Sequence, residues 1–253
     1  STNSSIGLIY ALKKIFKKNK KQRIFPYMNL KLKKYIKVLD LAKKNKITKF
    51  ELITNYGLFS GDTNLFKTLT IYEVLKKIEN VKGDIIELGI HKGNTSLLIK
   101  KIIDIFGIKK KIYLLDHFKG LIHYGPKDTK ASKIHLGACH GEKKQIQSFI
   151  NFFDFKNMSF IDKDATTLKE GFFGKKKFAF AYFDMDLYLP TLKGLEAIHK
   201  NMSKGGLIVF DEGNKKLWSE RFAIRDFLKK NRSKYKKITL SKKYAPDVVL
   251  QRI

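Results

Sequence analysis

An uninterrupted apolar run in the second half of the chain limits the folds that this sequence can adopt. Residues 178–183 read Phe-Ala-Phe-Ala-Tyr-Phe, and neither glycine nor proline interrupts them. Such a run predicts a strand buried on both faces, as in the middle of a parallel sheet. Asp184 and Asp186 follow directly. Carboxylates at the carboxyl end of a central strand are expected in the crevice where open α/β sheets bind ligands, although a single Asp-x-Asp also fits an ordinary polar loop.

A second segment repeats this design. The apolar residues 207–210 are followed by Asp211 and Glu212. Four carboxylates at two strand ends repel one another unless a cation or a proton lies among them. The repetition therefore favours a functional acidic centre over two unrelated polar loops.

Strand-like and helix-like segments alternate between residues 84 and 230. The expected strands are 84–88, 111–115, 158–161, 178–183 and 207–210, and the expected helices are 63–80, 95–106, 142–153, 167–173, 191–202 and 219–230. This alternation predicts an α/β fold with a doubly wound, mostly parallel sheet. Two further strands are expected at 238–240 and 248–251. They have no helix between them, which predicts an antiparallel edge.

The beginning of the chain has a different character. Residues 1–80 are expected to form an N-terminal helical extension or lid, and residues 81–253 the main domain. The stretch 6–23 is basic and amphipathic. Such a stretch can rest on an anionic membrane surface, but it more often packs on its own domain or on another subunit. The chain shows no secretory segment and no apolar run of bilayer length, which favours a cytoplasmic protein, with peripheral membrane contact left open.

The charge balance is strongly basic. The chain has 53 Lys and Arg residues against 23 Asp and Glu residues, a formal net charge of +30. This excess suggests an anionic partner such as nucleic acid, an acidic glycan, a nucleotide-sugar or a membrane. The alternative is a lysine-rich solvated surface, which is favoured because lysine greatly outnumbers arginine, the better phosphate-recognition residue. Cys139 is the single cysteine, which excludes an intrachain disulfide and a cysteine-based zinc site.

The first expected strand leads into a glycine-containing turn. Gly89 and Gly93 allow a tight turn and close approach of a ligand before the next helix, for which Asn94 is the expected cap. The pattern is neither G-x-G-x-x-G nor a P-loop. Asp116 ends the second strand, where an acid can accept ribose hydroxyls, and Asp164 follows the third. Acids at these strand ends without a phosphate cradle favour a nucleoside lacking phosphate, of which S-adenosylmethionine is the common example.

Four segments together resemble the macrocin O-methyltransferase (TylF-type) family of sugar methyltransferases. They are a Glu-x-Gly turn in 83–93, an Asp-x-Phe-x-Gly-Leu strand end in 115–121, an Asp-x-Asp-Leu-Tyr strand end in 182–191 and a Gly-Gly strand with a final acidic pair in 205–212. Their order and spacing agree jointly, and the resemblance covers residues 56–226. The chain is also similar to the calicheamicin-type branch of sugar methyltransferases. The resemblance implies a Rossmann-like class I methyltransferase fold.

The resemblance also implies roles for individual residues. Asp186 matches the residue proposed as general base. Asp184 and Asp211 match the carboxylates that hold a divalent ion, usually Mg²⁺, and Glu212 stands where many members have aspartate. The residues expected to bind the cofactor are Glu87, Gly89, His91, Gly93, Asp116, His117, Phe118, Asp164 and Ala165.

The leading functional hypothesis is therefore methyl transfer from S-adenosylmethionine to a sugar hydroxyl of a glycan, nucleotide-sugar or glycosylated metabolite. Acceptor specificity is expected in residues 122–142 and in the N-terminal helices, and the resemblance implies a homo-oligomer. An RNA methyltransferase is one alternative. The sequence has no RNA-binding module, and an acidic reaction centre repels phosphates, so no nucleic-acid partner is expected. A non-enzymatic basic surface-binding protein is the other alternative.

Overall fold

The structure is a computed structural model that describes residues 41, 43–48, 62–240, 246 and 248–253. The chain divides into two compact units, Ser1–Phe59 and Ser60–Ile253. The basic stretch 6–23 lies outside the described residues. Within them, no helix is both long and apolar enough to cross a membrane.

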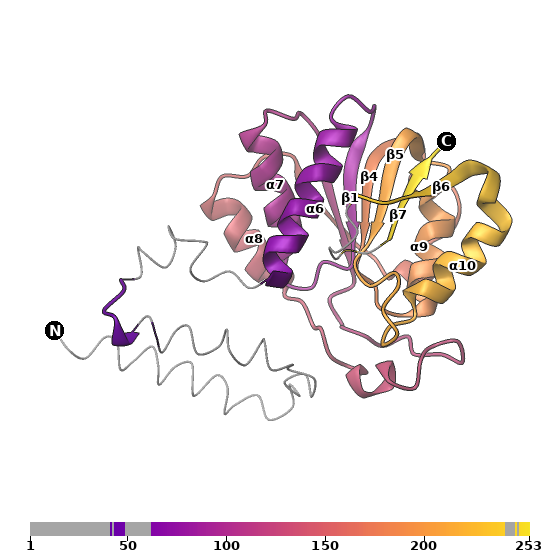
Figure 1. Ribbon diagram of the computed structural model, residues 1–253, viewed down its shortest axis with the longest axis horizontal. Coiled ribbons are helices and arrows are strands. Elements are labelled where there is room, and N and C mark those ends of the chain that lie inside the picture. Colours follow the sequence, from indigo (N-terminus) through magenta and orange to yellow (C-terminus); the bar gives the residue numbers. More distant parts are fainter. Residues whose placement is uncertain (1–40, 42, 49–61, 241–245, 247) are drawn as a thin grey trace. The chain divides into compact units, whose positions relative to one another are not determined.

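A seven-stranded sheet forms the centre of the second unit, with the order β3-β2-β1-β4-β5-β7-β6 (Figure 1). The strands are β1 Asp84–Leu88, β2 Ile112–Asp116, β3 Met158–Asp162, β4 Phe178–Phe183, β5 Met202–Phe210, β6 Tyr235–Ile238 and β7 Val248–Arg252. The first five pair in parallel, and β7 runs antiparallel to both β5 and β6. The expected mostly parallel sheet with an antiparallel edge is confirmed. The strand order reverses between β1 and β4, which is where sheets of this kind bind ligands.

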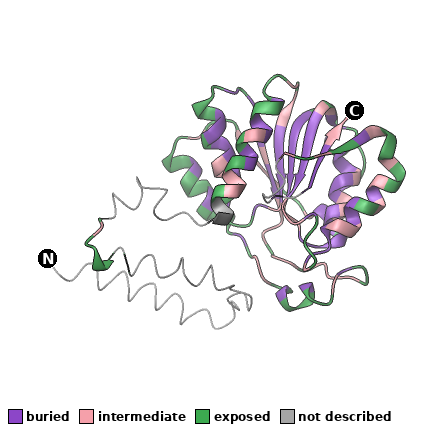
Figure 2. Ribbon diagram, viewed as in Figure 1, coloured by how far each residue is buried: buried purple, intermediate pink, exposed green. Residues whose placement is uncertain are grey.

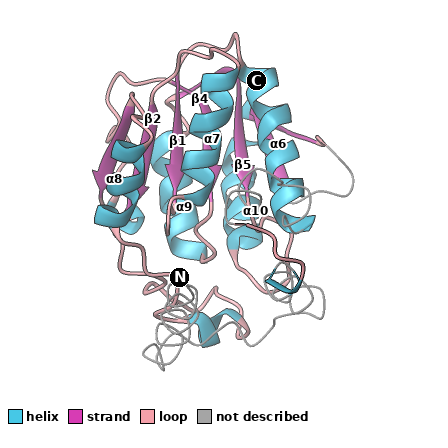
Figure 3. Cartoon of the chain, turned by 90° about the vertical axis from the view of Figure 1, so that its left-hand side faces the viewer, coloured by secondary structure: helices cyan, strands magenta, loops and turns pink. Residues whose placement is uncertain are grey.

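Helices cover both faces of this sheet. One face carries α6 Asp62–Ile78, α7 Asn94–Ile105 and α8 Lys143–Phe152, which Figure 3 shows in front of the strands. The other carries α9 Tyr188–Ile198 and α10 Glu220–Asn231. All six residues of β4 are buried, and Figure 2 shows the central strands mostly in the colour of buried residues. The sheet is therefore doubly wound.

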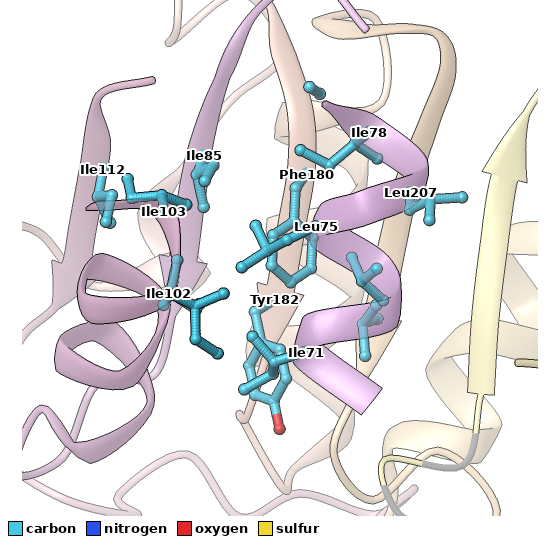
Figure 4. Packing of buried hydrophobic residues seen from close by; sticks show 14 of the residues in the cluster. Ile71, Leu75, Ile78, Ile85, Ile102, Ile103, Ile112, Phe180, Tyr182 and Leu207 are labelled. Atoms are coloured by element: carbon cyan, nitrogen blue, oxygen red, sulfur yellow. The ribbon is translucent and has the colours of Figure 1, made fainter. Parts of the chain in front are cut away.

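Helix α6 belongs to the sheet domain. Ile71, Leu75 and Ile78 are buried in one cluster with Phe180 and Tyr182 of β4 (Figure 4). The second compact unit begins at Ser60 and includes this helix. The apolar face of α6 decides this, because it has to be covered by the sheet.

Some expected local features are wrong. The helix expected at 167–173 is replaced by a 3-10 turn at Ala165–Thr167 and irregular turns. Asp164 stabilises this turn because its side chain accepts a hydrogen bond from the Thr166 amide, and Gly171 with a φ of 87° ends any helical continuation.

Two helix starts also differ from expectation. Gly93, with a φ of 80°, occupies the N-cap of α7 instead of Asn94. Helix α9 begins at Tyr188 and not at residue 191, so Pro190 lies inside its first turn. Proline is tolerated there because the first four amides of a helix have no intrahelical acceptor.

Candidate active site

The turn after β1 lies against the loop that follows β4. Gly89 has a φ of 86°, and a Cβ built on it would lie 2.1 Å from the Asp184 carbonyl oxygen. The Asp184 amide donates to the Leu88 carbonyl at 2.9 Å. Any side chain at Gly89 would therefore push the expected cofactor turn away from the acidic loop.

Asp116 fixes the backbone around this turn. One carboxylate oxygen accepts hydrogen bonds from the amides of Ile90 at 2.7 Å and His91 at 3.0 Å, and the other accepts from the Phe118 amide at 2.7 Å. His91 and Phe118 both have left-handed backbones, with φ of 52° and 60°. The carboxylate thus holds two strained loops in place, and its second oxygen retains capacity for a further donor.

Glu87 points into the protein interior between β1 and α7. Its side chain is buried and accepts a hydrogen bond from the Ser96 hydroxyl. Burial raises the pKa of Glu87 to about 8. Glu87 therefore stabilises the turn after β1 from the protein interior and does not line the pocket.

Replacing Glu87 with glutamine should change how the free energy of unfolding depends on pH. The folded-state pKa of about 8 lies above the ordinary value of 4.5, so the folded protein holds the proton more tightly than the unfolded chain. The stability that this proton contributes is fully present below pH 4.5 and is lost as the pH rises through about 8. Glutamine has no charge to bury. We expect the variant to gain about 2–4 kcal/mol relative to wild type between about pH 5 and about pH 9 in urea unfolding. A pH-independent difference would contradict this account.

Asp164 lies in a small polar cluster beside the third strand. One oxygen accepts from the Thr166 amide and hydroxyl at 2.8 Å, and the other pairs with His123. Burial by itself raises the pKa of Asp164, but the hydrogen bonds from Thr166 and His123 outweigh it and hold that pKa below its usual value. Potential ligand atoms of His117, His123 and Asp164 lie within 4.8 Å of one another. His123, from the long loop, was not among the expected cofactor residues.

A pocket lies at this edge of the sheet and joins the expected cofactor residues to the acidic loop. It is lined by Gly89, His91, Leu115, Asp116, His117, Gly120, Leu121, Ile122, His123, Cys139, Lys163, Ala165, Asp184, Met185, Asp186, Leu187 and Pro190. Five expected cofactor residues are part of this lining. The other four are not part of this lining: Glu87, Gly93, Phe118 and Asp164. The pocket is therefore the structural centre on which the sequence motifs converge.

Two of the expected acids meet at an ammonium group of the chain. Lys67 of α6 places its Nζ 2.9 Å from Asp211 Oδ1 and 3.8 Å from Asp184 Oδ2. The Tyr182 hydroxyl donates to the same oxygen of Asp211. The carboxyl ends of β4 and β5 thus converge, and a lysine that sequence reasoning missed supplies a cation between them. One signal was present: Lys67 lies four residues before Ile71, on the apolar stripe of α6.

The charges at this centre depend on one another. Burial by itself lowers the pKa of Lys67, but Asp211 and Asp184 outweigh it and hold that pKa above its usual value. Burial and the nearby Asp211 raise the pKa of Asp184. Lys67 therefore stays charged and stabilises a carboxylate pair that would otherwise repel itself.

Asp186 differs from Asp184 in conformation and surroundings. It adopts a left-handed backbone with a φ of 59°, and its carbonyl accepts from the Ser219 amide at 2.8 Å. Burial, followed by the charge of Asp184, raises the pKa of the Asp186 side chain well above its usual value. The side chain lines the pocket. Asp186 is thus a strongly basic carboxylate at the pocket wall when it is ionised.

Glu212 and Glu220 complete the acidic region in different ways. Glu212 Oε1 lies 2.8 Å from Lys215 Nζ. Glu220 is fully buried, and its two oxygens accept hydrogen bonds from the amides of Met185 and Glu212, each at 3.0 Å. Glu220 therefore ties the loop after β4 to the loop after β5. Sequence reasoning missed it, because a glutamate at a helix start is ordinary.

These motifs and this fold define an S-adenosylmethionine-type methyltransferase architecture, and comparison with known families specifies it further. The macrocin-O-methyltransferase (TylF) family model matches residues 67–239. The chain belongs to that family, and the resemblance expected from the four sequence motifs is confirmed.

Individual relatives agree with this assignment. A tetracenomycin-type rhamnosyl 4'-O-methyltransferase of Streptomyces olivaceus is 22% identical over 147 residues, which are 53% of this chain and 54% of the relative. The match thus spans about half of that curated relative. The crystal structure of CalS11, a calicheamicin methyltransferase, aligns with a TM-score of 0.72 at 20% identity, over 91% of this chain and 96% of that one. The O-methyltransferase NovP aligns with a TM-score of 0.62 at 17% identity, over 77% and 81%.

Proposed function

We propose that this protein transfers a methyl group from S-adenosylmethionine to a sugar hydroxyl of a glycan, nucleotide-sugar or glycosylated metabolite. The observation that carries the proposal is one pocket in which the Gly89 turn lies directly against Asp184 and in which Asp186 is part of the lining. Family membership supports O-methylation. Two similar proteins, a rhamnosyl 4'-O-methyltransferase and a TDP-rhamnose 3'-O-methyltransferase, support a sugar acceptor.

The pocket has the chemistry that this reaction needs. S-Adenosylmethionine supplies an electrophilic methyl group when it is bound. The Gly89 turn lines the pocket, and Asp116 and His117 offer polar groups in the same lining. Asp186 is proposed to accept the proton of the sugar hydroxyl, because its buried carboxylate is more basic than a solvated one. The walls align acceptor and donor, and this alignment lowers the entropic part of the barrier.

The carboxylate centre is also proposed to bind a divalent metal ion. Asp184 and Asp211 converge on one point and offer oxygen ligands, which Mg²⁺ prefers. Glu212 is proposed as a third ligand, and its pair with Lys215 would have to open. Mg²⁺, when bound, would lower the pKa of a coordinated sugar hydroxyl. Because Lys67 lies between the two aspartates, its side chain would have to turn away.

The function is tested with purified protein, S-adenosylmethionine and a panel of sugar acceptors. We expect calorimetric binding of S-adenosylmethionine and of its demethylated product, and methyl transfer to a nucleotide-sugar or a rhamnosyl glycoside. Structured RNA serves as the comparison substrate, and we expect no transfer to it. Failure to bind either form of the cofactor, or a preference for RNA, would overturn the proposal.

Chelation should show whether a metal ion contributes to the rate of methyl transfer and not to cofactor binding. We expect EDTA to lower the rate of methyl transfer by on the order of 10²-fold and added Mg²⁺ to restore it, because a Lewis acid stabilises the developing alkoxide by several kcal/mol. Binding of the demethylated cofactor should stay within about threefold in EDTA, since its expected contacts lie on the Gly89 side of the pocket. Full activity in EDTA would mean that the carboxylates act without a metal.

A further inference from the structure

Lys67 reaches the carboxylate centre because α6 is anchored on the sheet. Ile71 and Leu75 of α6 pack against Phe180 and Tyr182 of β4, as Figure 4 shows. Lys67 lies one helical turn before Ile71, so it extends the same face toward the carboxyl ends of the strands. Its position therefore follows from the packing of the helix and is not that of a solvated surface lysine.

The groups around Lys67 form a binding site for a cation. Its side chain is 16% exposed, and its Nζ lies 2.9 Å from Asp211 and 3.8 Å from Asp184. The ammonium also lies 5.7 Å from the centroid of the Tyr182 ring, within the range of a cation–π contact. Two carboxylates and an aromatic face thus contact one positive charge.

We propose that Lys67 is a tethered cation that competes with a divalent metal ion for Asp184 and Asp211. The proposal rests on the proposed function, because it concerns the loading of the same centre. An oxygen-coordinated Mg²⁺ lies about 2.1 Å from each ligand oxygen. An ammonium already bound to one of these oxygens and close to the other would occupy the same space and repel the ion.

The structure also shows how this exchange can occur. Residues 71–78 hold the helix backbone on the sheet, while the lysine side chain has four rotatable bonds beyond it. Lys67 can therefore leave the carboxylates by side-chain rotation alone. When it is bound, it offsets part of the negative charge of the pair and keeps the two strand ends together without metal. When it leaves, both carboxylates become available to the ion. Lys67 accordingly weakens the metal affinity of the centre and stabilises its metal-free form.

The test measures Mn²⁺ binding to the intact protein by electron paramagnetic resonance, without acceptor. Lys67→Met keeps the length of the side chain and removes its charge. The matched control is Lys76→Met, in the same helix, where the lysine is half exposed and pairs with Glu79 at 3.5 Å. We expect Lys67→Met to bind Mn²⁺ about tenfold or more tightly than wild type, and Lys76→Met to match wild type. Equal or weaker binding by Lys67→Met would overturn the proposal.

Two further variants show where the ion binds and keep the test valid if Lys67→Met does not fold. Adding Asp211→Asn to Lys67→Met should abolish the tight binding; if it persists, the ion lies elsewhere, for example at His117, His123 and Asp164, and the proposal fails. Lys67→Gln, which retains a donor for Asp211, should also bind Mn²⁺ more tightly if Lys67→Met does not fold. Calorimetry with the demethylated cofactor runs in parallel. Retained cofactor binding with unchanged Mn²⁺ affinity rejects only the role of Lys67, whereas loss of cofactor binding in wild type rejects the proposed function.

Discussion

Replacing Asp186 with asparagine should lower the rate of methyl transfer by on the order of 10³-fold, while the affinity for the demethylated cofactor stays within about threefold. Asparagine has nearly the same shape but cannot accept the proton of the acceptor hydroxyl. It also tolerates the left-handed backbone that Asp186 adopts, with a φ of 59°, so the loop should keep its course. The loss should therefore be confined to the chemical step.

Single-turnover kinetics with saturating S-adenosylmethionine measure this effect, and calorimetry measures cofactor affinity. The chain offers a matched control in Asp154, another left-handed aspartate with a φ of 50°, whose side chain is 78% exposed. Asp154→Asn should leave both quantities unchanged. Turnover near the wild-type rate in Asp186→Asn would remove Asp186 as the base and direct attention to another proton acceptor.

Removing the carboxylate of Glu220 should destabilise the folded protein. In Glu220→Ala the partly buried amides of Met185 and Glu212 lose their acceptors. A buried donor left without a partner costs about 1–3 kcal/mol, so we expect a loss of about 3 kcal/mol in unfolding free energy. Because both amides belong to the acidic loops, the folded fraction should also transfer methyl groups about 10²-fold more slowly.

A graded pair of variants distinguishes positioning from bulk stability. Glu220→Gln keeps one acceptor but presents its NH₂ group to the other amide, so it should lose about 1–2 kcal/mol. The control is Glu196→Ala in α9, which removes a half-exposed glutamate paired with Lys193 at 2.8 Å and should change stability by less than about 0.5 kcal/mol. If Glu220→Gln is destabilised but fully active once folded, Glu220 serves stability alone and does not position the acids.

Much of the fold follows from local patterns in the sequence. The unbroken run at 178–183 specifies a strand buried on both faces, and the structure places it as β4 in the middle of the sheet. The alternation of strands and helices specifies the parallel order, because parallel strands need a crossover. Two consecutive expected strands at the end of the sequence predict the antiparallel edge, and β6 and β7 pair in this way. These features could be predicted because each depends on neighbouring residues and on their period.

Two predictions of local structure were wrong, and at both places two local conformations compete. A helix was expected at 167–173, but the Asp164 carboxylate accepts a hydrogen bond from the Thr166 amide, and this bond favours a tight turn. Asn94 is a good cap by type, yet Gly93 takes the cap because its left-handed backbone is required at the turn. In both cases the geometry of the turn, and not residue preference, decided the outcome.

The candidate site also has a part that local sequence predicts and a part that it does not. The acidic strand ends Asp184, Asp186 and Asp211 could be located from the sequence, since their type and position relative to apolar runs are local. The position of Lys67 between two of them, and the link that Glu220 makes between their loops, depend on contacts between distant segments. Lys67 is far from Asp211 along the chain, and it is one of 53 basic residues that look alike in sequence. The packing of α6 on β4 brings this one lysine to the carboxylates, and such a contact is specified by the assembled core and not by any local pattern.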